Sequence, residues 1–249
     1  MLDGWLAAGL PGNCVQVVDP AVTPERRERW EARGVDIVPA PGPDAPAFMM
    51  LAVKPNTIED AIEATRESVE PNTVVVSVVA GVMLERFLPA YGLQSRCVRV
   101  MPNTPAQIGR GMSVCCPTRF VTDEDRDNVS ALLAALGAVE WLSDERLMDA
   151  VTAVSGSGPA YLFHMVEALA AAGVEAGLSP SLAARLAKAT ISGSGELVHR
   201  SSETPAQLRK AVTSPNGTTQ AGLDVLMPEL TDLLTRTVAA AAKRSRELG

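Results

Sequence analysis

Short β-branched apolar runs alternate with helix-like stretches between residues 15 and 143. Several of these runs are apolar on both faces, as parallel strands buried between two layers of helices must be. Strand–helix alternation of this kind predicts an α/β fold built on a doubly wound sheet. The expected strands are residues 15–18, 35–38, 48–53, 73–79, 97–101, 112–116 and 139–142, and the expected helices are residues 24–33, 57–69, 83–90 and 122–136.

The strand pattern stops after about residue 144, and the rest of the chain is typical of helices. The expected helical segments are residues 147–178, 180–199, 205–211, 216–226 and 228–248, with Ser179 as a candidate N-cap of the second. No flexible linker separates the two parts. We therefore expect an α/β domain over residues 1–143 that continues directly into an all-helical domain over residues 144–249.

The first residues do not supply the beginning that such a sheet needs. MLDGWLAAGL is typical of the later part of a helix, and the next expected strand ends at Asp19. In a dinucleotide-binding unit, a strand and a glycine-rich phosphate loop precede that helix. We therefore expect roughly 20 further residues before Met1 in the natural protein, with a shortened gene product as the alternative. A chain without them is expected to bind a dinucleotide poorly, to be marginally stable and to leave two neighbouring strands unpaired.

Composition narrows the possible partners and the compartment. The chain has 249 residues, 47% of them hydrophobic and 20% charged, with a net charge of −7. Because nucleic acid and anionic membranes favour a basic face, we expect neither as a partner. The first residues show no signal-peptide pattern and no apolar run is long enough to span a bilayer, so a cytoplasmic location is expected. All four cysteines are expected in strands, buried and reduced, and none has metal-ligand spacing, so no metal is expected.

Three loops are expected to follow buried strands at one edge of the sheet. They are LAVKPN at residues 51–56, SVVAGV at 77–82 and RVMPNTPAQIGRG at 99–111. Ligands of open α/β sheets bind at the carboxyl ends of the strands. Each loop taken alone could be a plain strand-to-loop turn, but three at one edge predict a binding site.

Two further stretches interrupt the helical part. AVTAVSGSGPAY, residues 150–161, carries two glycines and a proline inside a helical pattern, which predicts a kink, a close helix–helix contact or a break at the domain boundary. TSPNGTT, residues 213–219, is a turn followed by a helix start. Free amides at a helix N-terminus favour an anion such as a carboxylate, and the hydroxyls beside them can donate or accept. Simple capping is the alternative.

No catalytic triad or pair of carboxylates stands out. The two histidines are His164, expected to be a core residue of an apolar helix, and His199, expected to be solvated near a helix end. The absence of an acid–base pair fits a reaction in which a cofactor performs the difficult step.

In order and spacing, LAVKPN, SVVAGV, RVMPNTPA, SGSGPAY and TSPNGTT resemble the pyrroline-5-carboxylate reductases, over essentially the whole chain. The resemblance implies an N-terminally truncated Rossmann domain for NADPH or NADH over residues 1–143, and a helical dimerisation and substrate domain over residues 144–249. It implies a homodimer or an assembly of dimers, and hydride transfer to the C=N carbon of 1-pyrroline-5-carboxylate, giving L-proline. A non-catalytic remnant that only dimerises is the alternative.

The resemblance also assigns roles to individual residues. It makes Thr219 the catalytic residue, hydrogen-bonded to the ring nitrogen. The substrate contacts it implies are Ser214, Gly217, Thr218 and Thr219, and the cofactor contacts are Ala52, Val53, Lys54, Pro55, Asn56, Ala80 and Gly81. Asp19, at the end of its strand, is expected to contact the cofactor ribose. An acid there favours NADH, whereas Arg26 and Arg27 a little further along the chain leave NADPH as the alternative. Asn216 stands where many members have Gly, and it can adopt the left-handed conformation that the turn needs.

Overall fold

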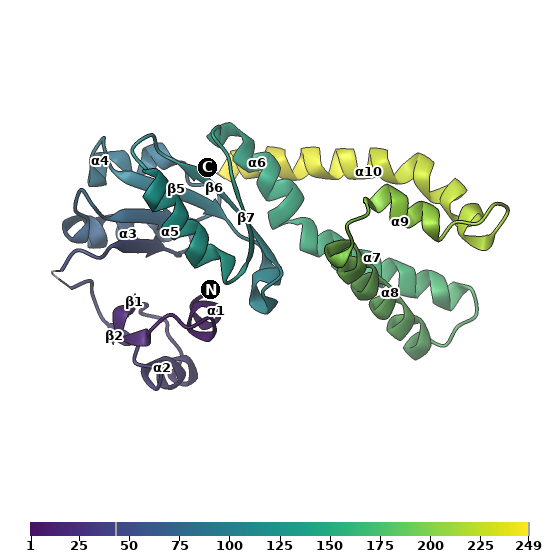
Figure 1. Cartoon of the computed structure of the whole chain (residues 1–249), viewed down its shortest axis with the longest axis horizontal. Helices are drawn as coiled ribbons and strands as arrows, with labels where there is room; N and C mark the ends of the chain where they lie inside the picture. The colour runs from purple at the N-terminus through teal and green to yellow at the C-terminus, as the bar shows by residue number, and fades with distance from the viewer. Residues whose placement is uncertain (43, 249) are drawn as a thin grey trace. The chain divides into compact units, whose positions relative to one another are not determined.

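The computed structural model describes residues 1–42 and 44–248. It divides into two compact units (Figure 1), which we describe separately. The first unit comprises Met1–Gly156 and Ala241–Gly249, and the second comprises Ser157–Ala240. The expected division into domains after residue 143 stays a prediction, because compactness within one chain does not measure which segment folds independently.

The first unit contains a five-stranded sheet in the order β3-β4-β5-β6-β7. β3 pairs with β4, β4 with β5, and β6 with β7 in parallel, whereas β5 and β6 are antiparallel. A parallel connection needs a crossover of about a dozen residues or more, and the nine residues 102–110 are too few. The strands are β3 (Phe48–Leu51), β4 (Val74–Ser77), β5 (Arg96–Met101), β6 (Gly111–Pro117) and β7 (Gly137–Trp141).

The sheet is buried on both faces, as the sequence pattern predicted. Val75 packs into one apolar cluster with Phe87 and Met148, while Val74 and Val76 pack into a second cluster with Leu133. Helix α5 (Asp123–Ala134) supplies the second cluster and begins at a capping box on Thr122. On the other face lie α3 (Ile58–Thr65), the short α4 (Leu88–Tyr91) and α6 (Met148–Val151).

The remaining strands, β1 (Gln16–Val18) and β2 (Asp36–Val38), form a separate parallel pair. Helices α1 (Leu2–Ala7) and α2 (Pro24–Glu31) pack around them through Leu6 and Trp30. Asp3 ties the two helices together by accepting hydrogen bonds from Trp30 Nε1 at 2.8 Å and Arg29 at 2.7 Å. Among the described residues no strand pairs with both β1 and β3, so each of them is hydrogen-bonded on one side only.

The second unit is helical. It contains α7 (Gly158–Glu175), α8 (Pro180–Arg200), α9 (Pro205–Ala211) and most of α10 (Thr218–Leu248). α7 and α8 pack together as a hairpin, in which a Cβ on Gly173 would lie 3.2 Å from Ala183 Cβ. None of the described helices is both long and apolar enough to cross a membrane.

Two expectations about this helical part are wrong, and a third holds in position only. Residues 216–226 and 228–248 are not two helices, because α10 continues through Pro228, whose missing amide removes only one bond from a 31-residue helix. Ser179 occupies the N-cap position of α8, as expected, although its side chain makes no capping hydrogen bond. His164 is not a core residue: its side chain is 80% exposed and lies 3.0 Å from Glu167.

The cysteine expectation holds for three of the four thiols. Cys97, Cys115 and Cys116 are buried in β5 and β6, but Cys14 is exposed and lies in a 3-10 turn, because the strand begins only at Gln16. Burial, together with the neighbouring Cys116, raises the pKa of Cys115 to about 12. Burial and the nearby carboxylate of Glu145 raise the pKa of Cys116 to about 11.

We expect Ellman's reagent to titrate only the exposed thiol of Cys14 in the native protein at pH 8, and all four thiols after denaturation. Cys14→Ser should abolish the native reaction. The pKa of the Cys115 thiol is 9.0 in the unfolded chain and about 12 in the folded protein. The free energy of unfolding that this thiol contributes is therefore lost as the pH rises from 9.0 towards about 12. Rapid labelling of Cys115 or Cys116 in the folded Cys14→Ser variant would contradict this assignment.

Candidate active site

Three of the loops singled out in the sequence lie at one edge of the five-stranded sheet. Leu51 of β3 is in register with Ser77 of β4, and Ser77 is in register with Arg99 of β5. Since these three strands are parallel, their carboxyl ends point the same way, and the loops that follow them share this edge. The sheet therefore gathers the residues that the sequence assigned to the cofactor after β3 and β4.

The loop after β3 is exposed and internally braced. Leu51 is buried, but Ala52, Val53, Lys54, Pro55 and Asn56 are all exposed. The carbonyl oxygen of Lys54 accepts hydrogen bonds from both the amide and the hydroxyl of Thr57, each at 3.0 Å. These hydrogen bonds and the ring of Pro55 restrict the conformation of the loop, while its residues stay exposed.

The loop after β4 is held at both ends. Ser77 Oγ accepts a hydrogen bond from the amide of Val79 at 3.3 Å, and a carboxylate oxygen of Glu145 accepts one from the amide of Leu84 at 2.9 Å. Between these points, Ala80 is exposed and Gly81 has a φ of +78°. A residue with a Cβ is strained in that conformation, which explains the glycine.

Asn103 connects the loop after β5 to the SGSGPAY stretch. Its Nδ2 donates to the carbonyl and the hydroxyl of Ser155 at 3.3 and 3.2 Å, and its Oδ1 accepts from the amide of Met112 at 2.9 Å. Ser155 lies in a π-helix, Thr152–Gly156, which is the form that the predicted helix break takes. Such wide turns occur often at functional sites.

The two glycines of that break differ. A Cβ on Gly156 would meet the Cε methyl of Met101, at the far end of a flexible side chain, so this glycine lies close to the last residue of β5. Around Gly158, no heavy atom of the described chain lies within 4 Å of an added Cβ. Gly156 therefore makes a close contact with a strand, and among the described residues neither glycine makes the close helix–helix contact that was one of the expectations.

The TSPNGTT stretch forms the predicted turn at the start of α10, in the second unit. The amide of Gly217 donates to the carbonyl of Ser214 at 3.0 Å, and Asn216 has a φ of +57°, the left-handed conformation expected of it. A Cβ on Gly217 would clash with Ser214 Oγ and lie 3.0 Å from the carbonyl oxygen of Ser214, which favours glycine at this position. The first amides of α10, including those of Thr218 and Thr219, have no acceptor within the helix.

The hydroxyls at this turn are available to a ligand. Ser214, Thr218 and Thr219 are exposed. Among the described residues, none of these three hydroxyls makes a hydrogen bond, so the simple capping alternative finds no support in the geometry. Free hydroxyls and free amides together suit a small anion.

Asp19 lies apart from these loops in sequence, at the carboxyl end of β1. It is half-buried, and its Oδ1 accepts a hydrogen bond from the amide of Ala21 at 2.9 Å. This bond fixes the carboxylate within the turn that leads to α2 and leaves its other oxygen able to accept from a ligand.

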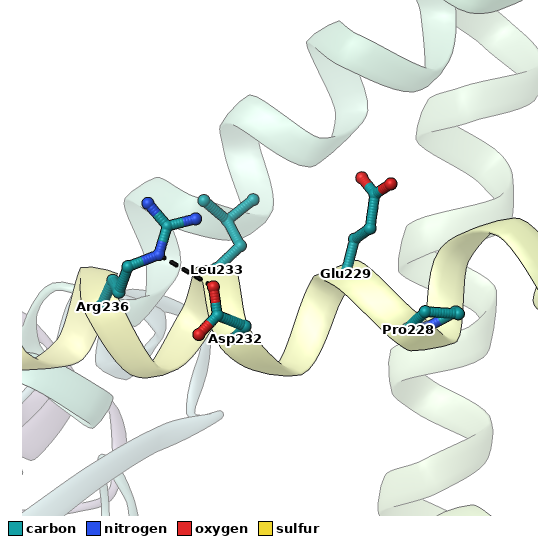
Figure 2. A pocket seen from close by; sticks show the side chains of 5 residues that line it. All are labelled: Pro228, Glu229, Asp232, Leu233 and Arg236. Carbon is teal, nitrogen blue, oxygen red and sulfur yellow. Dashed lines mark hydrogen bonds and ion pairs between the residues drawn. The ribbon is translucent and has the colours of Figure 1, made fainter.

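A hollow along the side of α10 involves none of the predicted residues. Figure 2 shows the five side chains that line it, all from this one helix: Pro228, Glu229, Asp232, Leu233 and Arg236. Asp232 and Arg236 form an ion pair at 3.0 Å across one turn of the helix. Its lining comes from a single helix, and Asp232 and Arg236 are paired with each other, so the hollow offers no catalytic arrangement among the described residues.

Comparison with known proteins identifies the family. Residues 145–248 match the family model described as pyrroline-5-carboxylate reductase dimerisation. A pyrroline-5-carboxylate reductase of Pisum sativum is 37% identical over 236 residues, which cover 94% of this chain and 86% of that protein. The chain belongs to the pyrroline-5-carboxylate reductase family.

Solved structures of pyrroline-5-carboxylate reductases agree. The one from Coxiella burnetii matches with a TM-score of 0.93 at 30% identity, over 100% of this chain and 93% of that chain. The pyrroline carboxylate reductase of Plasmodium falciparum, with NADP bound, matches with a TM-score of 0.80 at 26% identity, over 99% and 92% of the two chains. The expected family and fold class are confirmed, and the reductase is favoured over the non-catalytic alternative.

Sequence reasoning missed the side chains that hold these loops of the reductase. Arg99 is buried in β5 and pairs with Glu145 at 3.0 Å. Asn103 lies in the predicted loop at residues 99–111, and its hydrogen bonds to Ser155 were not expected. An arginine inside an otherwise apolar strand is a signal for a buried partner, but the sequence does not say which carboxylate supplies it.

Asn103→Leu should lower the free energy of unfolding by about 1–3 kcal/mol, because it leaves the amide of Met112 and the carbonyl of Ser155 without this partner. Urea unfolding measures the change. Asn128→Leu is the matched control, because Asn128 is exposed on α5, and it should shift stability by no more than about 0.5 kcal/mol. Equal stabilities of the two variants would show that Asn103 does not connect these segments.

Proposed function

We propose that this chain reduces 1-pyrroline-5-carboxylate to L-proline with NADPH or NADH. The observation that carries the proposal is the turn at residues 213–219, where exposed hydroxyls and unpaired amides meet at the start of α10. Its support is membership in the pyrroline-5-carboxylate reductase family at 37% identity over 94% of the chain.

In this proposal, the turn binds both polar groups of the substrate. The hydroxyl of Ser214 and the amides from Gly217 to Thr219 hold the carboxylate, because amides at a helix N-terminus carry partial positive charge. The hydroxyl of Thr219 hydrogen-bonds the ring nitrogen and orients the C=N bond. The reduction adds a hydride to the imine carbon and a proton to the nitrogen, so Thr219 acts where that proton arrives.

The residues at the sheet edge fit a nicotinamide cofactor, which when bound supplies the hydride. Ala52, Val53, Lys54, Pro55 and Asn56 present exposed backbone after β3, and Ala80 and Gly81 allow close approach after β4. Asp19, at the end of β1, accepts from the ribose hydroxyls. We propose these residues as the cofactor contacts, and we propose that Asp19 makes NADH the preferred cofactor.

We also propose that the protein is a homodimer or an assembly of dimers. α7 has no buried residue, although Leu162 and Phe163 on it are apolar and are 56% and 64% exposed. Val225 on α10 is 72% exposed. Large exposed apolar side chains on a helix that buries none of its own residues are typical of a protein–protein interface, and residues 145–248 match a dimerisation model. Buried thiols that remain free suit the reducing cytoplasm, which we propose as the compartment.

Thr219→Ala should lower kcat by about 100-fold, the size typical for loss of a group that assists proton transfer, while the melting temperature stays unchanged. Thr219→Ser, which keeps the hydroxyl, should recover most of the activity. Thr235→Ala on the same helix is the matched control, because its exposed hydroxyl bonds only the carbonyl of Thr231. Steady-state reduction of 1-pyrroline-5-carboxylate measures all three, and full turnover by Thr219→Ala would remove Thr219 from the mechanism.

Asp19→Asn should lower the ratio of kcat/KM with NADH to kcat/KM with NADPH by about tenfold or more, which corresponds to about 1.4 kcal/mol. Asparagine keeps an oxygen for the amide of Ala21, so the turn survives while the charge is lost. Asp36→Asn on the adjacent strand changes the net charge equally and should leave the ratio unchanged. An unaltered ratio in Asp19→Asn would exclude Asp19 as the selecting residue.

A further inference from the structure

One carboxylate oxygen joins three parts of the first unit. Oε1 of Glu145 accepts a hydrogen bond from the amide of Leu84 at 2.9 Å and from the guanidinium of Arg99 at 3.0 Å. Leu84 ends the loop after β4, Arg99 lies in β5, and Glu145 follows β7 at the start of the segment that leads into the helices. No residue of the predicted substrate or cofactor sites takes part in this cluster.

The cluster is buried. The side chains of Arg99 and Glu145 are 7% and 18% exposed, and the neighbours of Arg99 in register, Ser77 and Cys116, are also buried. A buried guanidinium requires a carboxylate partner, so the contact with Arg99 at 3.0 Å holds the Glu145 side chain in place. The orientation of Glu145 that meets Arg99 is the one that also meets the amide of Leu84.

The amide of Leu84 is the far anchor of the loop at residues 80–83. The near anchor is the bond from the amide of Val79 to Ser77 Oγ at 3.3 Å. Between the two anchors lie exposed Ala80, buried Gly81 in a left-handed conformation, and Val82, which packs against the apolar core. Because Ala80 and Gly81 have almost no side chain to pack, the backbone at these two residues depends on the contacts on either side of them. Releasing one end would make ligand binding bear the entropy of ordering the loop.

We propose that Glu145, charge-paired with Arg99, is a positioning residue that holds the loop at residues 80–83 in its cofactor-binding conformation. The inference rests on the proposed function, which places Ala80 and Gly81 against the nicotinamide cofactor. A purely structural ion pair would instead contribute to stability alone. A positioning role predicts that loss of Glu145 changes both cofactor affinity and hydrogen exchange at the Leu84 amide, whereas a purely structural role predicts a change in stability alone.

Glu145→Ala should speed hydrogen exchange at the Leu84 amide in the ligand-free protein by about tenfold or more. It should also raise KM for the nicotinamide cofactor about tenfold, the effect of losing one hydrogen bond to a charged group, while KM for 1-pyrroline-5-carboxylate stays within about twofold. Glu145→Gln removes the charge that pairs with Arg99, so it should lower the melting temperature. It keeps an oxygen that can accept the hydrogen bond from the amide of Leu84, so the cofactor KM should stay near that of the wild type.

The double variant Arg99→Met/Glu145→Met removes the unpaired buried charge. It should recover stability relative to Glu145→Ala but keep the raised cofactor KM, because no acceptor for Leu84 returns. The matched control is Asp125→Ala, at the opposite end of β5. Asp125 pairs with Arg96, the first residue of β5, at 3.4 Å, and it accepts a hydrogen bond from the amide of Thr122 at 2.9 Å. This control should lower the melting temperature without changing cofactor KM.

The positioning role is overturned if Glu145→Ala leaves either Leu84 exchange or cofactor affinity at the wild-type value, or if cofactor KM returns to normal in the stable double variant. Failure of the proposed function has a different signature, in which the wild type does not reduce 1-pyrroline-5-carboxylate. In that case, exchange at Leu84 and equilibrium titration with NADPH and NADH decide the role of Glu145 without catalysis.

Discussion

The parallel register of β3, β4 and β5 is the constraint on which the candidate cofactor site depends. Val74, Val75 and Val76 are buried on both faces of β4, so slipping the strand by one residue would interchange its two apolar faces and misalign every neighbour. With the register set, Leu51, Ser77 and Arg99 lie across from one another, and the chain leaves all three strands at the same edge. The loops meet there because of the sheet, whatever their own sequences.

Apolar burial brings the loops together, but hydrogen bonds from side chains hold their conformations. Asn103 joins the loop after β5 to Ser155 and Met112, and Glu145 joins the end of the loop after β4 to Arg99. Both connections reach the segment between β7 and α7. That segment, which includes the π-helix, therefore holds the loops at the sheet edge through side-chain hydrogen bonds and also connects the sheet to the helical unit.

The last turns of α10 belong to the same unit as the sheet. Ser245 Oγ donates to Asp149 Oδ1 at 2.7 Å, and Ala242 and Ser245 are buried. The first turn of α10 carries the substrate turn proposed above, so one continuous helix bears both features. The helical unit itself leaves Phe163 and Val225 exposed, which a single chain does not explain and a dimerising family does.

The sequence by itself determined the positions of the strands, the family, and the presence of a turn at residues 213–219. Apolar runs such as residues 73–79 mark buried strands because only parallel strands between helix layers are apolar on both faces, and Asn216 could be assigned a left-handed conformation from its residue type. Helix ends were not all determined by the sequence, since the break expected before Pro228 does not occur and α10 continues through it.

Only the tertiary structure decided which side chains meet. The partner of Arg99 is 46 residues away in the chain, and that of Asn103 is 52 residues away, separations that no local pattern encodes. Exposure of His164 and of Cys14 likewise follows from what packs against them, not from the apolar residues beside them in sequence. Local chemistry is written in neighbouring residues, whereas burial and pairing depend on segments that folding alone brings together.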